Sequence, residues 1–323
     1  MNEKVLNFEA LEKNLEYYSS KKVCAMVKAN AYGHGVKEVV EHLRDKVEYF
    51  GVCSQAEALE VRRFCDTKIL IVSPFVDIDS CKKHNFEFFV ENLEMLKKAK
   101  TLHCLNLVHI KINSGMNRFG FDIDDKQVLK KLRTELKNEH IAGFCTHFAC
   151  LDDVKITKKQ YQKFIKIKKF LGVTALTHLG GSEVIEYNFD YDMIRVGIGL
   201  YVQKGSQVLG INSQIVDIHN LSRGTVGYDG RFEVTKPSRV AVAPVGYADG
   251  LPRLSSGAFV QINGKRCKIV GNICMDVCFV DVSNVNCKIG DKVEVLPNVF
   301  ELAKKCHTIT YEILTNFNNL RDR

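Results

Sequence analysis

Short apolar runs alternate with longer polar segments through about the first 200 of the 323 residues of this chain. Eight runs have the character of strands, at 23–27, 47–53, 68–73, 86–90, 105–112, 141–147, 173–178 and 193–198. Helical patterns lie between most of them, for example at 54–64, 92–100, 123–136 and 153–171. This alternation predicts parallel strands joined by crossover helices, and eight such units predict a TIM-like (β/α)8 barrel. A doubly wound open sheet is the alternative, but no GxGxxG turn follows the first run.

The pattern changes after about residue 201. Short β-rich runs follow one another with Gly, Asn and Asp between them and few helical periods, at 209–216, 239–244, 259–262, 268–271 and 278–282. Such a pattern predicts a mainly β C-terminal domain. Residues 1–8 could supply a strand to either domain, and we assign them to the second. The predicted domains are therefore a barrel over 9–204 and a β domain over 205–323 plus 1–8.

The composition, 46% hydrophobic and 26% charged, is that of a soluble globular protein. No apolar stretch approaches the roughly 18–20 residues that a spanning helix needs. The N-terminus lacks a basic segment followed by an apolar core, so we expect no secretion signal and a cytoplasmic location. The twelve cysteines form no CxxC pair. We therefore expect reduced thiols and no metal site.

The net charge of +8 raises the question of nucleic-acid binding. The lysines at 155–169 follow helical spacing, which is typical of a solvated helix face. No zinc-finger or RNA-binding signature accompanies them. The charge supports only a mild preference for anionic ligands, and we expect neither nucleic-acid nor membrane partners.

Polar residues cluster where the predicted barrel strands end. In this fold chemistry is carried at the C-terminal ends of the strands. Lys28 follows the first strand, Arg118 follows the fifth, and His147 ends the sixth. The seventh strand ends at His178 and is followed by Ser182, and Arg195 lies on the eighth strand. Each alone is often structural, but together they predict an active-site mouth.

Lys28 follows an apolar run and precedes a glycine-containing turn. An amine at the end of a buried strand is partly desolvated and is a usable nucleophile, although such lysines often only extend into solvent. The Gly-Gly-Ser turn at 180–182 is placed where this fold often binds phosphate. A nucleophilic lysine beside a phosphate cradle suggests covalently held pyridoxal phosphate.

The segment VKANAYGHG at 27–35 resembles the cofactor-lysine motif of alanine racemases. Further segments are similar to motifs of that family, in family order: INSGMNRFG at 112–120, THFA at 146–149, MIRVGIGLY at 193–201, VGYADGLPR at 245–253, GNICMD at 271–276 and TYE at 310–312. Each is modestly specific, whereas their joint occurrence in both predicted domains is highly specific.

The resemblance implies two catalytic bases. Lys28 would hold pyridoxal phosphate and act on one face of the substrate Cα, and Tyr247 would act on the other face from the partner subunit of a homodimer. A racemase must remove and return a proton on both faces, so one base per face is chemically reasonable. Tyr247 would have His147 as its hydrogen-bonding neighbour, with Arg195 behind.

The resemblance also implies binding roles. Arg195 would contact the pyridine nitrogen, and its permanent charge would keep that nitrogen unprotonated. The phosphate would be bound by Tyr32, Ser182, Gly197, Ile198 and Tyr311. Arg118 and the backbone N–H of Met275 would orient the substrate carboxylate.

Some positions depart from the family pattern. The family commonly has an acidic residue at the position of Asn113 and an asparagine at the position of Gly181. The β domain is also shorter than is usual in the family. In some members the lysine matching Lys111 is carbamylated and positions the arginine matching Arg118. We carry this modification to Lys111 as a hypothesis.

The resemblance implies an alanine racemase that supplies D-alanine for peptidoglycan. Alternatives are a racemase of broader specificity that also takes serine, a fold-related decarboxylase, and a non-catalytic carrier of pyridoxal phosphate. Arg195 argues against the decarboxylase, since such enzymes prefer an acidic partner at the pyridine nitrogen. The β domain with Tyr247 argues against the carrier, which resembles the barrel alone.

Overall fold

The structure, a computed structural model, describes residues 2–203 and 205–322. The chain separates into two compact units. One contains residues 13–31 and 36–200, and the other contains 2–12, 32–35 and the described residues from 201 onward.

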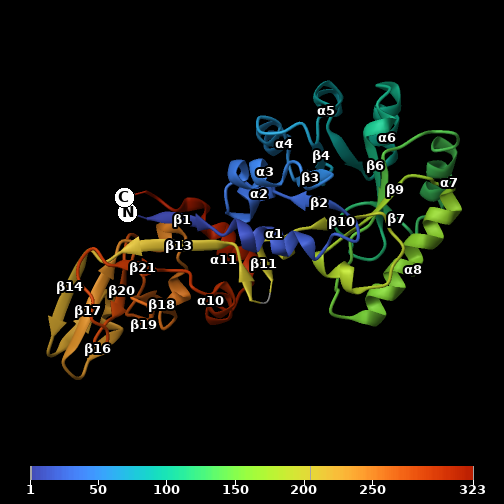
Figure 1. The fold of residues 1–323 in the computed structure, drawn as a ribbon. Coiled ribbons are helices and arrows are strands. Elements are labelled where there is room, and N and C mark those ends of the chain that lie inside the picture. Colours follow the sequence, from blue (N-terminus) through green and yellow to red (C-terminus); the bar gives the residue numbers. More distant parts are fainter. Residues whose placement is uncertain (1, 204, 323) are drawn as a thin grey trace. The chain divides into compact units, whose positions relative to one another are not determined.

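The first unit is built on eight parallel strands that close into a barrel (Figure 1). The strands pair in chain order, and the pairing of β5 with β6 closes the ring. They are β2 (Lys22–Met26), β3 (Tyr49–Val52), β4 (Lys68–Ile71), β5 (Glu87–Val90), β6 (Val108–Asn113), β8 (Gly143–Cys145), β9 (Leu176–Gly180) and β10 (Met193–Val196). The predicted (β/α)8 barrel is confirmed.

Helices follow most of the strands and cover the outside of the barrel (Figure 1). They are α3 (Val36–Leu43), α4 (Gln55–Arg62), α5 (Ile78–His84), α6 (Leu93–Thr101), α7 (Lys126–Glu135) and α8 (Val154–Leu171). Shorter elements are α1 (Phe8–Glu16), α2 (Lys28–Tyr32), α9 (Ile198–Tyr201), β7 (Phe121–Asp122) and the 3-10 turns η1 (Leu105–Leu107) and η2 (Ser182–Glu186). Side-chain caps at Ser54, Asp77, Asn92, Asp125 and Asp153 begin five of the helices.

The strands differ from the predicted ranges mainly at their ends. The run at 105–112 begins with the 3-10 turn η1, and the strand itself starts only at Val108. The run at 173–178 starts late, at Leu176, and continues to Gly180. An apolar run shows where chain is buried, but it does not separate a strand from the turn that leads into it.

The second unit contains an eight-stranded antiparallel sheet. Its order is β1 (Glu3–Leu6), β13 (Leu209–Gln214), β21 (Lys292–Glu294), β18 (Phe259–Ile262), β19 (Lys265–Val270), β20 (Cys278–Asp281), β17 (Ser238–Ala243) and β14 (Asp217–Leu221). Two hairpins accompany it, β11 (Val202–Gln203) with β12 (Ser206–Gln207) and β15 (Gly224–Val226) with β16 (Phe232–Val234). The N-terminal strand β1 thus pairs with β13 of this sheet.

Two helices complete the second unit, α10 (Val299–Lys305) and α11 (Thr310–Asn316). Its 3-10 turns are η3 (Tyr228–Gly230), η4 (Tyr247–Asp249), η5 (Arg253–Ser255) and η6 (Phe317–Asn319). The predicted mainly β architecture is confirmed, although the sequence pattern did not indicate the two helices. Each is only 7 residues long, too short to show clear helical periodicity.

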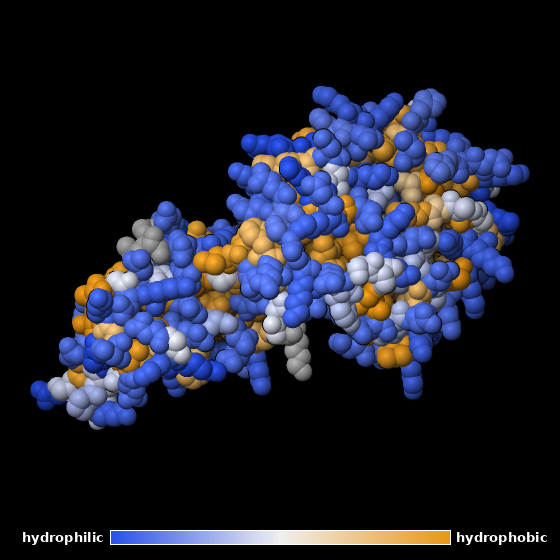
Figure 2. Space-filling view, in the orientation of Figure 1, coloured by the Kyte–Doolittle hydropathy of each residue, from blue (hydrophilic) through white to orange (hydrophobic). Residues whose placement is uncertain are grey.

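Hydrophilic residues cover most of the face seen in Figure 2, with apolar residues scattered among them. Among the described residues, no helix is both long enough and apolar enough to cross a bilayer. All twelve cysteines carry free thiols, and eight of them are buried.

Candidate active site

Lys28 begins an unusual turn at the mouth of the barrel. Strand β2 ends at Met26, so Lys28 lies just beyond the strand rather than within it, and its side chain is half-buried. The four residues that follow, 29–32, all have φ between 52° and 54°, which is the left-handed helical region. This conformation costs L-residues roughly 1–2 kcal/mol each, so surrounding contacts must hold the turn.

Two side chains hold this turn. Glu57 on α4 accepts a hydrogen bond from the Ala29 N–H at 2.7 Å, and its other oxygen accepts from the N–H groups of Cys53 and Ser54 at 2.7 and 3.1 Å. Asn30 accepts from the Val36 N–H at 2.7 Å, where α3 begins. The backbone after Lys28 is therefore fixed to the next βα loop. Sequence reasoning missed Glu57, although its Ser-x-x-Glu capping box is a readable signal.

Ser182 lies at the centre of a cluster of hydrogen-bond donors at the ends of β9 and β10. Its Oγ accepts from the N–H groups of Gly197 at 3.2 Å and Gly199 at 3.1 Å, and Ile198 lies between them. The hydroxyl of buried Tyr18 also contacts Ser182, while burial raises the pKa of Tyr18. A Cβ at Gly199 would stand 2.1 Å from Tyr18 Oη, so only glycine allows this close approach.

Arg195 is buried at the centre of the barrel and only 5% exposed. Its Nη1 lies 2.5 Å from His178 Nδ1, and its Nη2 donates to the Thr146 carbonyl oxygen at 2.6 Å. A Cβ at Gly180 would stand 2.1 Å from His147 Nδ1 and 2.3 Å from Arg195 Nη2. Because Gly180 has no side chain, His147 and Arg195 can both lie over its backbone.

His147 is a neutral imidazole among cations. Burial lowers its pKa well below the ordinary value, and the charges of Lys111, Arg195, Arg118 and Lys28 lower it further. All four of these charges belong to predicted site residues. A neutral ring there can accept or donate a hydrogen bond without adding another positive charge.

Lys111 points into the barrel from β6 and is 5% exposed. Burial lowers the pKa of its amine to about 7, and the charges of Arg195 and Arg118 contribute to the shift. The amine lies 5.8 Å from the centre of the Phe89 ring, and the guanidinium carbon of Arg195 lies 5.5 Å from the same centre. A substantial fraction of Lys111 is therefore unprotonated and nucleophilic near neutral pH.

Arg118 is exposed on the loop after β6. Asn113 organises this loop, since its amide oxygen accepts from the N–H groups of Gly115 at 3.1 Å and Asn117 at 2.9 Å. Asn113 thus provides an accepting oxygen, as would the acidic residue that is common in the family at this position. Gly181 has φ 105°, and a Cβ there would stand 2.4 Å from a Leu151 methyl group.

The remaining predicted residues belong to the second unit. The buried ring of Tyr32 stacks on Tyr201 with centroids 5.0 Å apart, and its centroid lies 6.0 Å from that of Tyr311. Tyr311 stands in the first turn of α11 and is 38% exposed. Tyr32 and Tyr311, which are 279 positions apart in the sequence, are therefore neighbours.

Tyr247 and Met275 are also neighbours. The Tyr247 N–H donates to the Cys274 carbonyl oxygen at 3.0 Å, and the Ala248 N–H donates to that of Met275 at 3.1 Å. Both side chains are substantially exposed, Tyr247 at 43% and Met275 at 52%. A Cβ at Gly246 would stand 2.3 Å from the Met275 oxygen, so this close crossing requires glycine.

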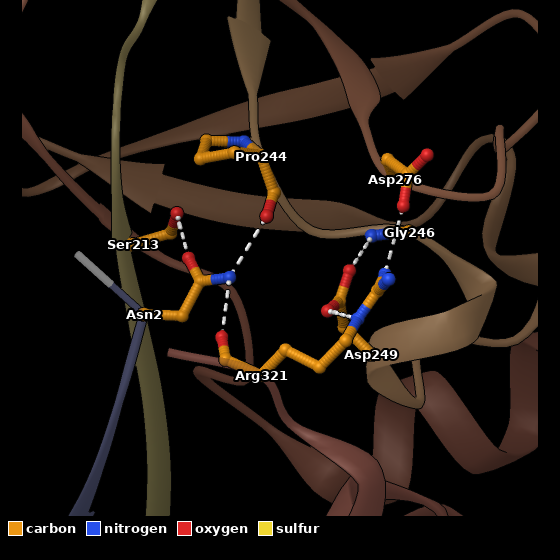
Figure 3. Close-up of polar contacts among 7 residues, drawn as sticks. All are labelled: Asn2, Ser213, Pro244, Gly246, Asp249, Asp276 and Arg321. Atoms are coloured by element: carbon orange, nitrogen blue, oxygen red, sulfur yellow. Dashed lines mark hydrogen bonds and ion pairs between the residues drawn. The ribbon is translucent and has the colours of Figure 1, made fainter. Parts of the chain in front are cut away.

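A network of polar contacts braces the turn that carries Tyr247 (Figure 3). Fully buried Asp249 accepts from the Gly246 N–H at 2.9 Å and from Arg321 at 2.7 Å, and Arg321 also pairs with Asp276 at 2.9 Å. Asn2 donates to the carbonyl oxygens of Pro244 at 2.8 Å and Arg321 at 3.3 Å. Both ends of the chain thus contribute to this network, which sequence reasoning missed.

Two family models match the chain. The model described as "Alanine racemase, N-terminal domain" matches residues 6–204, and "Alanine racemase, C-terminal domain" matches 208–323. The chain belongs to the alanine racemase family. The resemblance seen in the motifs is confirmed.

Individual alanine racemases are similar over nearly the whole chain. That of Thermodesulfovibrio yellowstonii is 34% identical over 319 residues, covering 92% of this chain and 87% of that protein. That of Francisella tularensis subsp. holarctica is 31% identical over 339 residues, covering 94% and 93%.

Solved alanine racemase structures share the fold. The structure from Acinetobacter baumannii has a TM-score of 0.89 at 29% identity, covering all of this chain and 98% of that one. That from Bartonella henselae, with covalently bound pyridoxal phosphate, has a TM-score of 0.87 at 25% identity, covering 98% and 97%.

The residues present fit pyridoxal phosphate, the cofactor of this family. Ser182 and the N–H groups of Gly197 and Gly199 supply donors for a phosphate where two strands end. Half-buried Lys28 supplies the amine, and buried Arg195 supplies a fixed positive charge. These groups match what the cofactor requires, namely hydrogen-bond donors for its phosphate, a nucleophilic amine for its aldehyde and a fixed charge for its pyridine nitrogen.

Proposed function

We propose that this protein is an alanine racemase that interconverts L- and D-alanine with pyridoxal phosphate. The observation that carries the proposal is the match of both domains to alanine racemases. It is supported by the positions of Lys28, His147, Ser182 and Arg195, which lie at or just after the C-terminal ends of four barrel strands. When bound, the cofactor would acidify the Cα–H bond of the amino acid by withdrawing electrons.

Lys28 would hold the cofactor and move a proton on one face of Cα. The held turn at 29–32 supports this role, because it fixes the backbone from which the amine extends. Tyr247 would move a proton on the opposite face. Its exposed side chain on a braced turn is suited to reaching a substrate bound by another subunit.

Phosphate binding would use Ser182, Gly197 and Ile198, and also Tyr32 and Tyr311. The converging N–H donors around Ser182 support the first part. The packing of Tyr32 near Tyr311 supports the second. His147, which its lowered pKa keeps neutral, would be the hydrogen-bonding neighbour of Tyr247.

Arg195 would meet the pyridine nitrogen. A guanidinium only donates hydrogen bonds and stays protonated, so it favours an unprotonated pyridine nitrogen. The cofactor would then be a weaker electron sink, which disfavours decarboxylation and transamination. This property separates a racemase from the fold-related decarboxylases.

Arg118 and the Met275 N–H would orient the substrate carboxylate, and Lys111 would position Arg118 as a carbamate. In that modification the neutral Lys111 amine attacks the carbon of CO2, a C–N bond forms as one C–O π bond breaks to leave a carboxylate oxygen, and the nitrogen releases one proton to solvent. The lowered pKa of Lys111 supports the hypothesis, because only the unprotonated amine reacts. Incubation with 13C-bicarbonate should give a carbamate NMR signal that Lys111→Gln abolishes; an unchanged spectrum would contradict it.

A homodimer with composite active sites is part of the proposal, as is supply of D-alanine for peptidoglycan. The dimer follows from the role of Tyr247, since a base on the second face would come from the partner. The cytoplasmic location and the domain division at 204/205 stay predictions from the sequence.

Solvent-deuterium exchange at Cα, measured over a panel of L- and D-amino acids, tests the function. We expect exchange and racemisation of alanine from either enantiomer, with CO2 release undetectable. If serine is exchanged and racemised at rates comparable to those of alanine, the enzyme is a racemase of broader specificity. CO2 release from a basic amino acid would contradict racemisation as the function.

Tyr247→Phe tests the assignment of the second base. The variant removes only the hydroxyl, so we expect most racemisation to be lost while the cofactor absorbance is retained. Tyr228→Phe is a matched control, because Tyr228 is exposed on η3 of the same unit. Undiminished turnover in Tyr247→Phe would show that Tyr247 is not a base.

A further inference from the structure

A chain of titratable side chains runs through the interior of the barrel from Arg195. Arg195 Nη1 lies 2.5 Å from His178 Nδ1, His178 Nε2 lies 2.7 Å from His109 Nδ1, and His109 Nε2 lies 2.5 Å from Glu87 Oε2. All four residues are at most 5% exposed. Four polar residues in a barrel interior, hydrogen-bonded end to end, indicate a built network rather than incidental packing.

The protons of this network have a single consistent arrangement. The guanidinium of Arg195 can only donate, so Nδ1 of His178 must accept. His178 then carries its proton on Nε2 and donates to His109 Nδ1. His109 likewise carries its proton on Nε2 and donates to the Glu87 carboxylate. Both rings are therefore neutral, in agreement with burial lowering the pKa of each.

The charges at the two ends are opposite. Burial would raise the pKa of Glu87, but its contacts with His109 and with Lys68, whose amine lies 3.0 Å away, lower it overall. Glu87 is therefore ionised. Arg195 donates to His178 and to a backbone carbonyl, which are both uncharged groups. The carboxylate that the network offers Arg195 is thus Glu87, two imidazole rings away.

The backbone leaves room for the network. A Cβ at Gly143 would stand 2.0 Å from His109 Nδ1, so a side chain there would displace the ring. Strand β6 alternates between outward apolar residues, such as Ile110, and the inward His109 and Lys111. The ring of His109 is therefore accommodated by two strands, because β6 directs it inward and β8 has no side chain at Gly143.

We propose that Glu87 is the counter-ion of Arg195, and that His109 and His178 are positioning residues that transmit its effect. The proposal rests on the proposed function for the contact of Arg195 with the cofactor pyridine nitrogen. Both ring lone pairs point toward Arg195 and both N–H groups toward Glu87, so their dipoles favour the guanidinium charge and fix its orientation. Arg195 would then hold the pyridine nitrogen by a hydrogen bond of fixed direction.

Histidine NMR on the 15N-labelled apoprotein tests the network without the cofactor. At pH 7 we expect His109 and His178 to be neutral with the proton on Nε2. Glu87→Gln should shift the signals of both rings, whereas Glu48→Gln, an exposed carboxylate lining the pocket beside Lys68, should not. A cationic ring, an Nδ1–H tautomer in the native protein, or rings that ignore Glu87→Gln would overturn the proposal.

The 15N signal of pyridine-labelled cofactor in the holoenzyme tests the effect on Arg195. Carboxylates that orient metal-ligating histidines typically change metal affinity or activity ten- to hundredfold, and we take the lower end of this range as a guide for a carboxylate that acts through two rings. We expect Glu87→Gln to move the pyridine signal and lower kcat about tenfold, with little change in KM and partial recovery in Glu87→Asp. An unmoved pyridine signal would overturn the transmitted effect. Failure of the native protein to bind cofactor would instead overturn the proposed function, leaving the histidine result intact.

Discussion

At the scale of single residues, burial rather than identity determines what the titratable groups of the barrel can do. Lys111 is the clearest case, because its amine is nearly removed from solvent and has Arg195 and Arg118 nearby. Sequence reasoning identified Lys111 only through the family resemblance. Its neutral fraction depends on burial inside the barrel and on Arg195, which another strand contributes, and no local pattern reveals either.

The lowered pKa of Lys111 predicts a pH-dependent stability. Between its folded pKa of about 7 and the ordinary value of 10.5, the unfolded chain binds a proton that the folded protein does not. The free energy of unfolding should therefore rise with pH in this window, by about 2–3 kcal/mol between pH 7 and pH 9. Chemical denaturation in CO2-free buffer, with Lys111→Met as reference, measures it; parallel curves for the two proteins would contradict it.

Asp249 is expected to stabilise the turn that carries Tyr247. It is fully buried, with Arg321 and the Gly246 N–H as partners. Asp249→Asn should lower the free energy of unfolding by about 2 kcal/mol, the usual range for a hydrogen-bonded buried charge, and should lower kcat. Asp276→Asn is the matched control, because Asp276 contacts the same arginine but is 50% exposed. Equal effects of the two variants in denaturation and turnover would be inconsistent with this role.

At the scale of elements, the left-handed turn after β2 links the sequence to the chemistry. The motif at 27–35 pointed to the position of Lys28, yet nothing in its composition indicated four successive residues with positive φ. Ala and Tyr disfavour that conformation, so local propensity argues against it. The turn exists because Glu57 binds its backbone at Ala29 and because Asn30 binds the backbone of α3 at Val36. Such contacts are not visible in a local sequence pattern.

Glu57→Gln should loosen this turn. Both carboxylate oxygens accept backbone N–H groups, and an amide can supply only one accepting oxygen. We expect a loss of about 1 kcal/mol in the free energy of unfolding and a lower kcat, because the backbone that positions Lys28 becomes mobile. Glu60→Gln, on the exposed face of the same helix, is the control. Native turnover and stability in Glu57→Gln would count against the role of Glu57.

Strand and helix order was predictable because each barrel strand is an apolar run bounded by turn residues. The Glu87–His109–His178 chain was not predicted, although its signal is present. Glu87 is the polar residue of the otherwise apolar strand β5, and His109 alternates with apolar residues on β6; both positions face the barrel interior. Recognising them required knowing which strands face one another across the interior.

At the scale of the whole molecule, the predicted site residues divide between the two units. Lys28, His147, Ser182 and Arg195 belong to the barrel, while Tyr247, Met275 and Tyr311 belong to the second unit. The sequence indicated both groups through the family motifs. A single chain does not show which copy of the second unit completes a given barrel, and the proposal assigns it to the partner subunit.

Mixed dimers test directly whether Lys28 and Tyr247 of one active site come from different subunits. Lys28→Ala and Tyr247→Phe chains, carrying different affinity tags, are co-expressed and the mixed species is purified. If each site combines Lys28 of one chain with Tyr247 of the other, one of the two sites is fully native, and we expect about half of the wild-type racemisation per dimer. Both homodimers of the variants should be nearly inactive. A mixed dimer as inactive as the two homodimers would place both bases on one chain and contradict the two-subunit site.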